Sequence, residues 1–300
     1  MRYHFLGSLF LLGVLSLETN AVSADTPKLL VTLKPVHALV SGLTKGISHP
    51  VLLLDGMQSP HDYQLRPSER RLLESADIII YTSDNIESFI LPMRDSLGKR
   101  RLLALDKLPG LALLPARGSH TDHHADNDGH IWLSPVNAIV IVKQLADILI
   151  KLDPANTSQY MGNRDHQIQR LDQLHKQVSE QLLPIRHRPF LQFHDALQYF
   201  ERDYGLDHGI AVTSGAEHAP GARHVRALQQ QISDENIRCF LYEPPQPPKL
   251  LRTLDVKRNA TMQALEIHGS QMKAGEDLYF DLIQDIATKI HSCLQQEKEH

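Results

Sequence analysis

Three histidines, His61, His130 and His194, lie far apart in this chain, and each stands just beyond an apolar run. Zinc favours a tetrahedral set of nitrogen, sulfur and oxygen ligands, so three imidazoles and one carboxylate would suit it. None of the three has a partner at the spacing of a local zinc motif. A site built from them therefore requires the whole fold to bring distant segments together, and metal handling is the leading hypothesis.

A short histidine-rich tract leads into His130. Between Ser119 and His130 it mixes histidine with aspartate and shows no apolar periodicity, which predicts a polar loop. Short tracts of this composition bind transition metals. We expect weak accessory metal capture by His120, His123 and His124, and a purely solvated loop is the alternative.

Several acidic residues could assist such a site. Asp62 and Asp195 directly follow two of the histidines, where they could orient the imidazoles or cap the helices that follow. Glu266 ends an apolar run and is the candidate for a carboxylate ligand. Glu243, which precedes a Pro-Pro pair, could be a metal ligand, but a role in satisfying backbone or side-chain hydrogen-bond donors in the cleft is favoured. His218, His224 and His268 are interpreted as surface or loop-packing residues.

The bulk composition excludes other classes of function. The 300 residues suit one large domain or two of ordinary size, and 42% hydrophobic residues are enough for a core. The net charge is −4 with no basic block, which argues against nucleic-acid binding. The sequence contains no HExxH, Walker A or GxSxG motif, so no enzyme class is indicated.

The N-terminus predicts a cleavable export signal over residues 1–24. Arg2 supplies a positive start, residues 5–17 are apolar, and the small residues at 22–24 suit cleavage. The apolar stretch is short for an uncleaved membrane anchor. Export to an oxidising compartment favours a disulfide between Cys239 and Cys293. Two buried free thiols are the alternative, because the sequence does not establish their distance.

Strand-like and helix-like segments alternate along the chain, which predicts a parallel-sheet α/β fold. The expected strands are 29–33, 51–54, 77–81, 190–193, 239–242 and 262–267. Helices are expected from Pro67, over 135–152 behind the N-cap Ser134, and over 276–294.

The alternation is interrupted by one long amphipathic helix over 155–183, in which apolar residues recur at steps of three or four. The predicted organisation is a lobe at 25–154, a stiff linker helix at 155–184 and a lobe at 185–300. Ligands of such sheets bind beyond the carboxyl ends of the strands. A crevice between the lobes could therefore receive all three histidines.

An ordered set of motifs closely resembles the periplasmic zinc-binding proteins of bacterial ABC uptake systems, within the metal-specific solute-binding family. The resemblance spans essentially the mature chain. The matching pieces are Ser59-Pro60-His61-Asp62-Tyr63, Leu65-Arg66-Pro67-Ser68, His130-Ile131-Trp132-Leu133-Ser134-Pro135, Phe193-His194-Asp195-Ala196, Tyr199-Phe200, Pro220-Gly221-Ala222 and Glu243-Pro244.

The resemblance implies two α/β lobes joined by a long rigid helix, with His61, His130 and His194 holding metal in the cleft. A histidine at the third position fits zinc better than manganese, because the manganese-binding relatives commonly have glutamate there. The family's usual cleft aspartate is replaced by Glu266, which leaves the fourth ligand open between Glu266, water and another cleft residue. Relatives often carry a second-lobe disulfide, which would match the two cysteines.

The sequence thus predicts a monomeric periplasmic protein, without catalytic activity, that captures Zn²⁺ and delivers it to the membrane permease of an ABC importer. A zinc hydrolase that uses the three histidines with Glu266 as base is the first alternative. An adhesin or interaction protein that carries structural zinc is the second.

Overall fold

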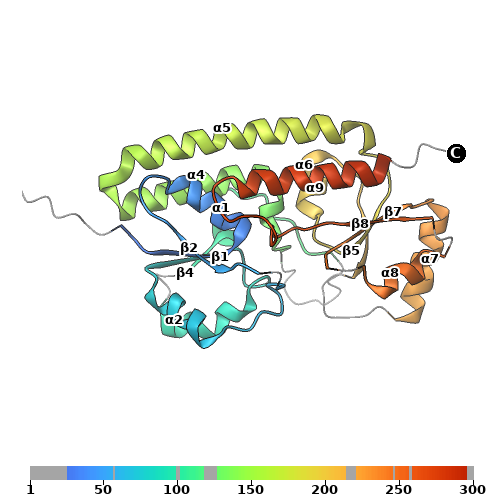
Figure 1. Cartoon of the computed structure of the whole chain (residues 1–300), viewed down its shortest axis with the longest axis horizontal. Coiled ribbons are helices and arrows are strands. Elements are labelled where there is room, and N and C mark those ends of the chain that lie inside the picture. The colour runs from blue at the N-terminus through green and yellow to red at the C-terminus, as the bar shows by residue number, and fades with distance from the viewer. Residues whose placement is uncertain are drawn as a thin grey trace, which may run out of the picture.

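The computed structural model describes residues 26–56, 58–98, 102–117, 127–213, 221–245, 247–256 and 259–295. The predicted export signal at 1–24 lies outside these ranges, as do His120, His123 and His124 of the predicted accessory loop. Two four-stranded parallel sheets with surrounding helices form two lobes (Figure 1), so the predicted α/β fold is confirmed.

The first lobe has the strand order β2-β1-β3-β4, with all neighbours parallel. Its central strand, β1, is buried along its whole length, as an apolar run in a parallel sheet covered on both faces should be. The strands are β1 (Leu29–Leu33), β2 (Val51–Leu54), β3 (Ile78–Tyr81) and β4 (Leu102–Ala104), and the helices are α1 (Lys34–Leu43), α2 (Pro67–Ser75) and α3 (Arg94–Leu97).

The second lobe repeats this arrangement with the strand order β6-β5-β7-β8, again fully parallel. Each sheet therefore places its first strand second in the order, between the two strands that follow it in the chain. The strands are β5 (Leu191–His194), β6 (Ile210–Thr213), β7 (Cys239–Tyr242) and β8 (Thr261–Ala264), and the helices are α6 (Gln198–Tyr204), α7 (Ala222–Asp234) and α8 (Lys249–Leu254).

The three longest helices are α4 (Pro135–Leu152), α5 (Thr157–Leu182) and α9 (Leu278–Gln295). Helix α4 begins as predicted, because the Ser134 hydroxyl accepts the backbone N–H of Asn137. The 26-residue α5 runs along both lobes, and α9 runs beside it (Figure 1). Short 3-10 helices span Ser88–Met93, Leu105–Lys107, Ile131–Leu133, Pro154–Asn156 and Leu183–Ile185.

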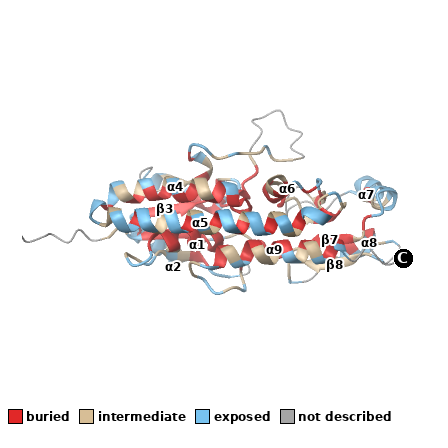
Figure 2. Cartoon of the chain, turned by 90° about the horizontal axis from the view of Figure 1, so that it is seen from above, coloured by how far each residue is buried: buried red, intermediate tan, exposed pale blue. Residues whose placement is uncertain are grey.

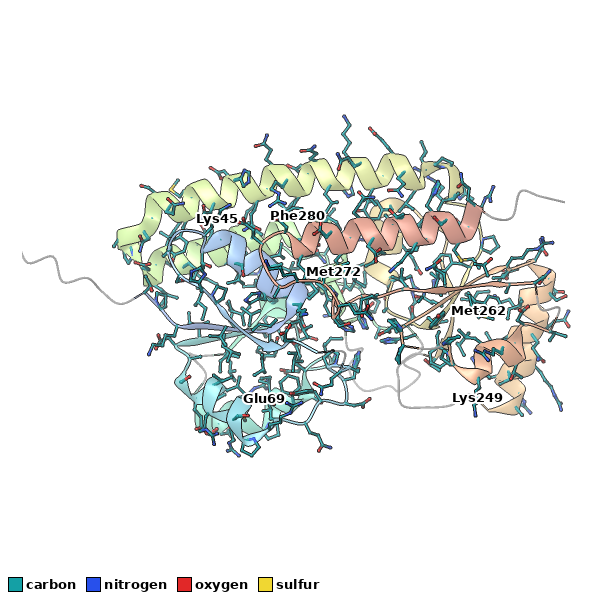
Figure 3. The ribbon with its side chains drawn as sticks, in the orientation of Figure 1. Lys45, Glu69, Lys249, Met262, Met272 and Phe280 are labelled. Carbon is teal, nitrogen blue, oxygen red and sulfur yellow. A yellow bond between two sulfur atoms is a disulfide. The ribbon has the colours of Figure 1, made fainter. Side chains whose placement is uncertain are left out.

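Helix α9 was not predicted as a second connection between the lobes. The Arg170 guanidinium of α5 lies 3.8 Å from the ring centre of Phe280 on α9. Figure 3 labels Phe280 between the two helices. The Gln284 amide of α9 also donates to Gln181 Oε1 of α5 at 2.7 Å. The two lobes are therefore joined by a pair of packed helices, rather than by the single predicted linker.

One apolar core extends from the first sheet, through the buried faces of α4, α5 and α9, into the second lobe (Figure 2). A smaller cluster lies on the outer side of the second sheet and includes Leu191, Phe240 and Leu251. The shared core crosses the predicted domain limits at 154 and 184, and those limits stay a prediction.

A disulfide joins Cys239 at the start of β7 to Cys293 near the end of α9, with the two Cα atoms 5.5 Å apart. The predicted pairing is therefore present. It fastens the second sheet to the helix that runs back along α5. No helix in the described ranges combines the length and apolar character needed to cross a membrane.

Candidate metal centre

The three predicted histidines converge where the two lobes meet. One nitrogen from each of His61, His130 and His194 lies within 4.8 Å of the others. Their ring centroids are 4.9 to 5.6 Å apart. His61 lies in the loop beyond β2 and His194 is the last residue of β5, so both lie beyond or at the carboxyl end of a parallel strand.

A carboxylate two residues away orients His130. Asp128 Oδ1 accepts the backbone N–H of His130 at 2.9 Å and the ring Nδ1–H at 2.7 Å. The proton therefore lies on Nδ1, and the lone pair of Nε2 is left for a metal. That Nε2 atom is buried and makes no hydrogen bond with the described residues. The Tyr199 hydroxyl of α6 donates to the Asp128 carbonyl at 2.7 Å, which ties this turn to the second lobe.

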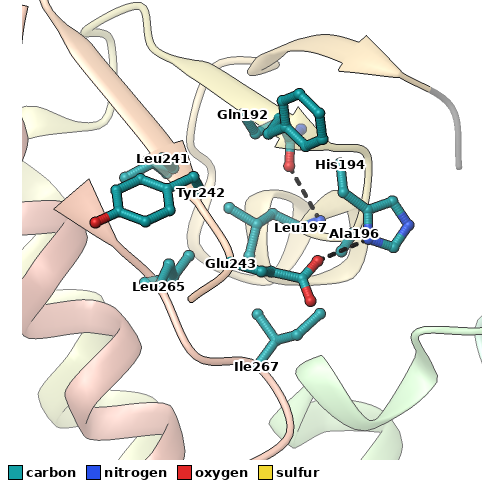
Figure 4. Close-up of a pocket in the computed structure, with 10 residues that line it drawn as sticks. Gln192, His194, Ala196, Leu197, Leu241, Tyr242, Glu243, Leu265 and Ile267 are labelled. Atoms are coloured by element: carbon teal, nitrogen blue, oxygen red, sulfur yellow. Dashed lines mark hydrogen bonds and ion pairs between the residues drawn. The ribbon is translucent and has the colours of Figure 1, made fainter. Parts of the chain in front are cut away.

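His194 is oriented by a residue that is distant in sequence. Its Nδ1 lies 2.8 Å from Glu243 Oε1, just beyond β7 (Figure 4). Burial disfavours the cationic form of His194, but the hydrogen bond and charge of Glu243 outweigh burial and raise its pKa. Burial also opposes ionisation of Glu243, yet the hydrogen bond and charge of His194 lower the Glu243 pKa to about 2. Glu243 thus serves as a half-buried hydrogen-bond acceptor, in agreement with the favoured prediction.

His61 is held in its neutral form. Burial, followed by the positive charges that His130 and His194 can carry, lowers its pKa to about 3. Its Nε2 is buried and has no hydrogen-bond partner among the described residues. A neutral imidazole with an unused lone pair is the form that coordinates a metal ion.

The acids adjacent to the histidines do not orient them. Asp195 Oδ1 instead accepts from Arg117 at 3.0 Å and from Gln192 at 3.3 Å. Asp62 is exposed, and no side-chain hydrogen bond of Asp62 occurs within the described ranges. The expectation that Asp62 and Asp195 orient the imidazoles is therefore wrong. No sequence pattern identified Asp128 for this role.

Glu266 does not join the group of three nitrogens. Its Oε1 accepts the backbone N–H of His268 at 2.9 Å, and its Oε2 accepts the hydroxyl of Ser270. Both oxygens are thus engaged within their own loop. Glu266 as the fourth ligand stays a prediction, and its contacts support a role in shaping this loop instead.

The loop that follows β8 belongs to the second lobe in sequence but is bound by the first. The buried ammonium of Lys34 donates to the Ser270 carbonyl at 2.9 Å and to the Met272 carbonyl at 3.1 Å. The Trp132 indole N–H donates to the Ile267 carbonyl at 2.9 Å. No sequence pattern predicts these contacts, because their partners are more than a hundred residues apart.

A family model described as "Zinc-uptake complex component A periplasmic" matches residues 29–293. The chain belongs to this family. It is similar to the high-affinity zinc uptake system protein ZnuA of Brucella suis, with 30% identity over 97% of this chain and 98% of the relative. The corresponding Haemophilus ducreyi protein is 28% identical over 96% of this chain and 98% of its own length.

Solved structures show the same fold. A zinc-bound ZnuA deletion mutant has a TM-score of 0.77 at 22% identity, covering 90% of this chain and 98% of its own. The Pseudomonas aeruginosa solute-binding protein FpvC in complex with Mn²⁺ has a TM-score of 0.78 at 20% identity, covering 90% and 99%. The predicted family is confirmed, and the hydrolase alternative receives no support from these relatives.

Proposed function

We propose that this protein captures Zn²⁺ in the periplasm with His61, His130 and His194, and delivers it to the permease of an ABC importer. The observation that carries the proposal is the convergence of three imidazole nitrogens within 4.8 Å of one another. The buried Nε2 atoms of His61 and His130 have no other partner within the described ranges. A divalent cation would satisfy the lone pairs that burial leaves unused.

The charges around the site suit a divalent cation. Asp128 and Glu243 each accept a hydrogen bond from the Nδ1–H of a site histidine, and this arrangement increases the basicity of the ligating nitrogen. Two carboxylates also supply two negative charges beside an ion that carries two positive ones. A buried cation without such compensation would be costly.

The donor set favours zinc over manganese. Imidazole nitrogens suit zinc, whereas manganese prefers carboxylate, carbonyl and water oxygens. The two nearby carboxylates, on Asp128 and Glu243, are directed at Nδ1 atoms instead of at the centre of the three-histidine group. We infer a monomeric carrier that binds and releases its cargo without catalysing a reaction.

Equilibrium zinc titration of the mature chain in competition with a chelator tests the proposal. We expect one tight site in the wild type and its loss in His194→Ala. His187→Ala is a matched control, because His187 lies before β5 instead of at its end and is 77% exposed. Unchanged tight binding in His194→Ala would overturn the ligand assignment, and stoichiometric manganese in protein from the native compartment would overturn the choice of metal.

A further inference from the structure

We propose that His268 is a fourth imidazole ligand of the captured ion, so that the closed site contains four histidines. This inference rests on the proposed zinc capture and specifies its coordination. Structural zinc sites are almost always four-coordinate and tetrahedral. The three converging histidines leave one position, which Glu266 does not occupy in this structure.

His268 reproduces the local arrangement of His130. In both cases an acid two residues earlier accepts the backbone N–H of the histidine at 2.9 Å, Asp128 for His130 and Glu266 for His268. The same carboxylate oxygen faces the ring Nδ1, at 2.7 Å in the first case and 3.9 Å in the second. The Glu266 contact is longer than a hydrogen bond, but it directs the acid to the same side of the ring.

The opposite nitrogen is available in both residues. The Nε2 atoms of His130 and His268 are buried, and neither has a hydrogen-bond partner in the described parts of the chain. Burial of a polar atom without a partner costs free energy, so such an atom requires an explanation. For His130 the explanation is a metal ion, and the matching arrangement assigns the same explanation to His268.

The two histidines lie on the same aromatic side chain. The ring centroid of Trp132 is 5.2 Å from that of His130 and 5.5 Å from that of His268. His268 thus belongs to the surroundings of the site, although its nitrogens lie outside the group of three.

The loop that carries His268 is held by the first lobe on both sides. Trp132 binds the carbonyl of the preceding residue, Ile267, and Lys34 binds the carbonyls of Ser270 and Met272. These contacts fix the backbone, so the ring can approach the ion only by side-chain rotation. Zinc would draw the His268 ring inward by side-chain rotation, and Glu266 would then become its positioning residue instead of a ligand.

X-ray absorption at the zinc edge tests this directly, because multiple scattering counts coordinated imidazoles. We expect four imidazoles in the wild type, and three plus a light oxygen or nitrogen atom in His268→Leu. His268→Gln, which keeps a polar side chain in the loop, should give the same loss if the leucine variant folds poorly. Zinc affinity should fall more than about 10-fold, since even outer-shell partners of a metal are worth 10–100-fold. His187→Ala should change neither readout.

The failures of the two proposals are distinguishable. A wild type that binds no zinc would overturn the proposed function and this inference together. Tight zinc binding with three imidazoles and a carboxylate oxygen that disappears in Glu266→Gln would overturn only the role of His268. Three imidazoles in both the wild type and His268→Leu, at equal affinity, would also overturn it and leave zinc capture intact.

Discussion

The two lobes have sheets of the same strand order, yet they orient their histidines by different means. In the first lobe, Asp128 accepts both the backbone N–H and the ring N–H of His130 within one short turn. In the second lobe, the acid that accepts from His194 is Glu243, which is 49 positions away. In both lobes a carboxylate accepts a hydrogen bond from the ring Nδ1. The carboxylate is near in sequence in the first lobe, whereas in the second lobe the tertiary fold brings it to the histidine.

The pairing of parallel strands explains the distant contact. In the second sheet, Leu191 pairs with Phe240 and Gln192 with Leu241. Continuing this register by two residues places His194 beside Glu243, just where β7 ends. A shift of one residue would turn the side chains to the opposite faces of the sheet. The second lobe therefore needs a correct sheet to build its part of the site, whereas the first needs only a correct turn.

Removal of a ligand from either lobe should have the largest effect. His130→Ala and His194→Ala should each weaken zinc binding more than 100-fold, because loss of an outer-shell partner alone costs about 10–100-fold. Competition titration with a chelator measures both constants. If one substitution leaves zinc affinity nearly unchanged, the ion is held by one lobe. That result would contradict a site with ligands from both lobes.

Glu243→Gln tests the long-range contact through the pH dependence of binding. In the wild type, Glu243 raises the pKa of His194, so zinc must displace a proton and affinity falls as pH drops through that raised value. Without the Glu243 charge, burial is opposed only by the smaller effects of Asp128 and Asp195, so the pKa of His194 should fall.

The loss of affinity on acidification should therefore shift to lower pH in Glu243→Gln. At a pH above the titration of His194 in both proteins, affinity should still fall by about 10–100-fold because the ring is less well oriented. Zinc titrations across pH 5 to 8 measure both effects. An unshifted pH profile would contradict control of His194 by Glu243.

Asp128→Asn removes the local contact and should weaken zinc binding by about 10-fold, at the lower end of the outer-shell range. The smaller effect is expected because the asparagine carbonyl can still accept from the backbone N–H of His130. Asp128→Ala, which removes the acceptor of both hydrogen bonds, should be the more severe of the two. Wild-type affinity in both variants would show that the carboxylate does not orient this ring.

The parts of the fold that the sequence predicted are those with strong local signals. β1, β2 and β7 begin and end where their apolar runs do, and α4 begins at its Ser-Pro cap. Strands β4 and β6 were missed. β4 (Leu-Leu-Ala) has only three residues, and β6 (Ile-Ala-Val-Thr) has four. Both are edge strands, and most of their residues are only half-buried.

The three histidines of the site could be predicted because imidazoles are zinc ligands. Their positions near the ends of predicted strands also indicated one shared crevice. Their orienting acids could not be predicted, because a carboxylate can reach an imidazole from any neighbouring strand or turn. Proximity in sequence favoured Asp195, but in a strand successive side chains point to opposite faces. Asp195 accordingly turns away from the ring of His194 and binds Arg117.

Asp62→Asn should have the smallest effect on zinc affinity. It tests whether an acid that is adjacent to a ligand in sequence orients that ligand. Asp62 is exposed and follows His61 directly in sequence, but its side chain has no hydrogen bond within the described ranges. An exposed charge is screened by water and salt, so zinc affinity should change by less than about 2-fold at physiological ionic strength. Competition titration with a chelator measures the zinc affinity of Asp62→Asn, which is then compared with that of Glu243→Gln. A 10-fold loss in Asp62→Asn would mean that adjacency in sequence, and not the register of the sheet, selects the acids that orient the ligands.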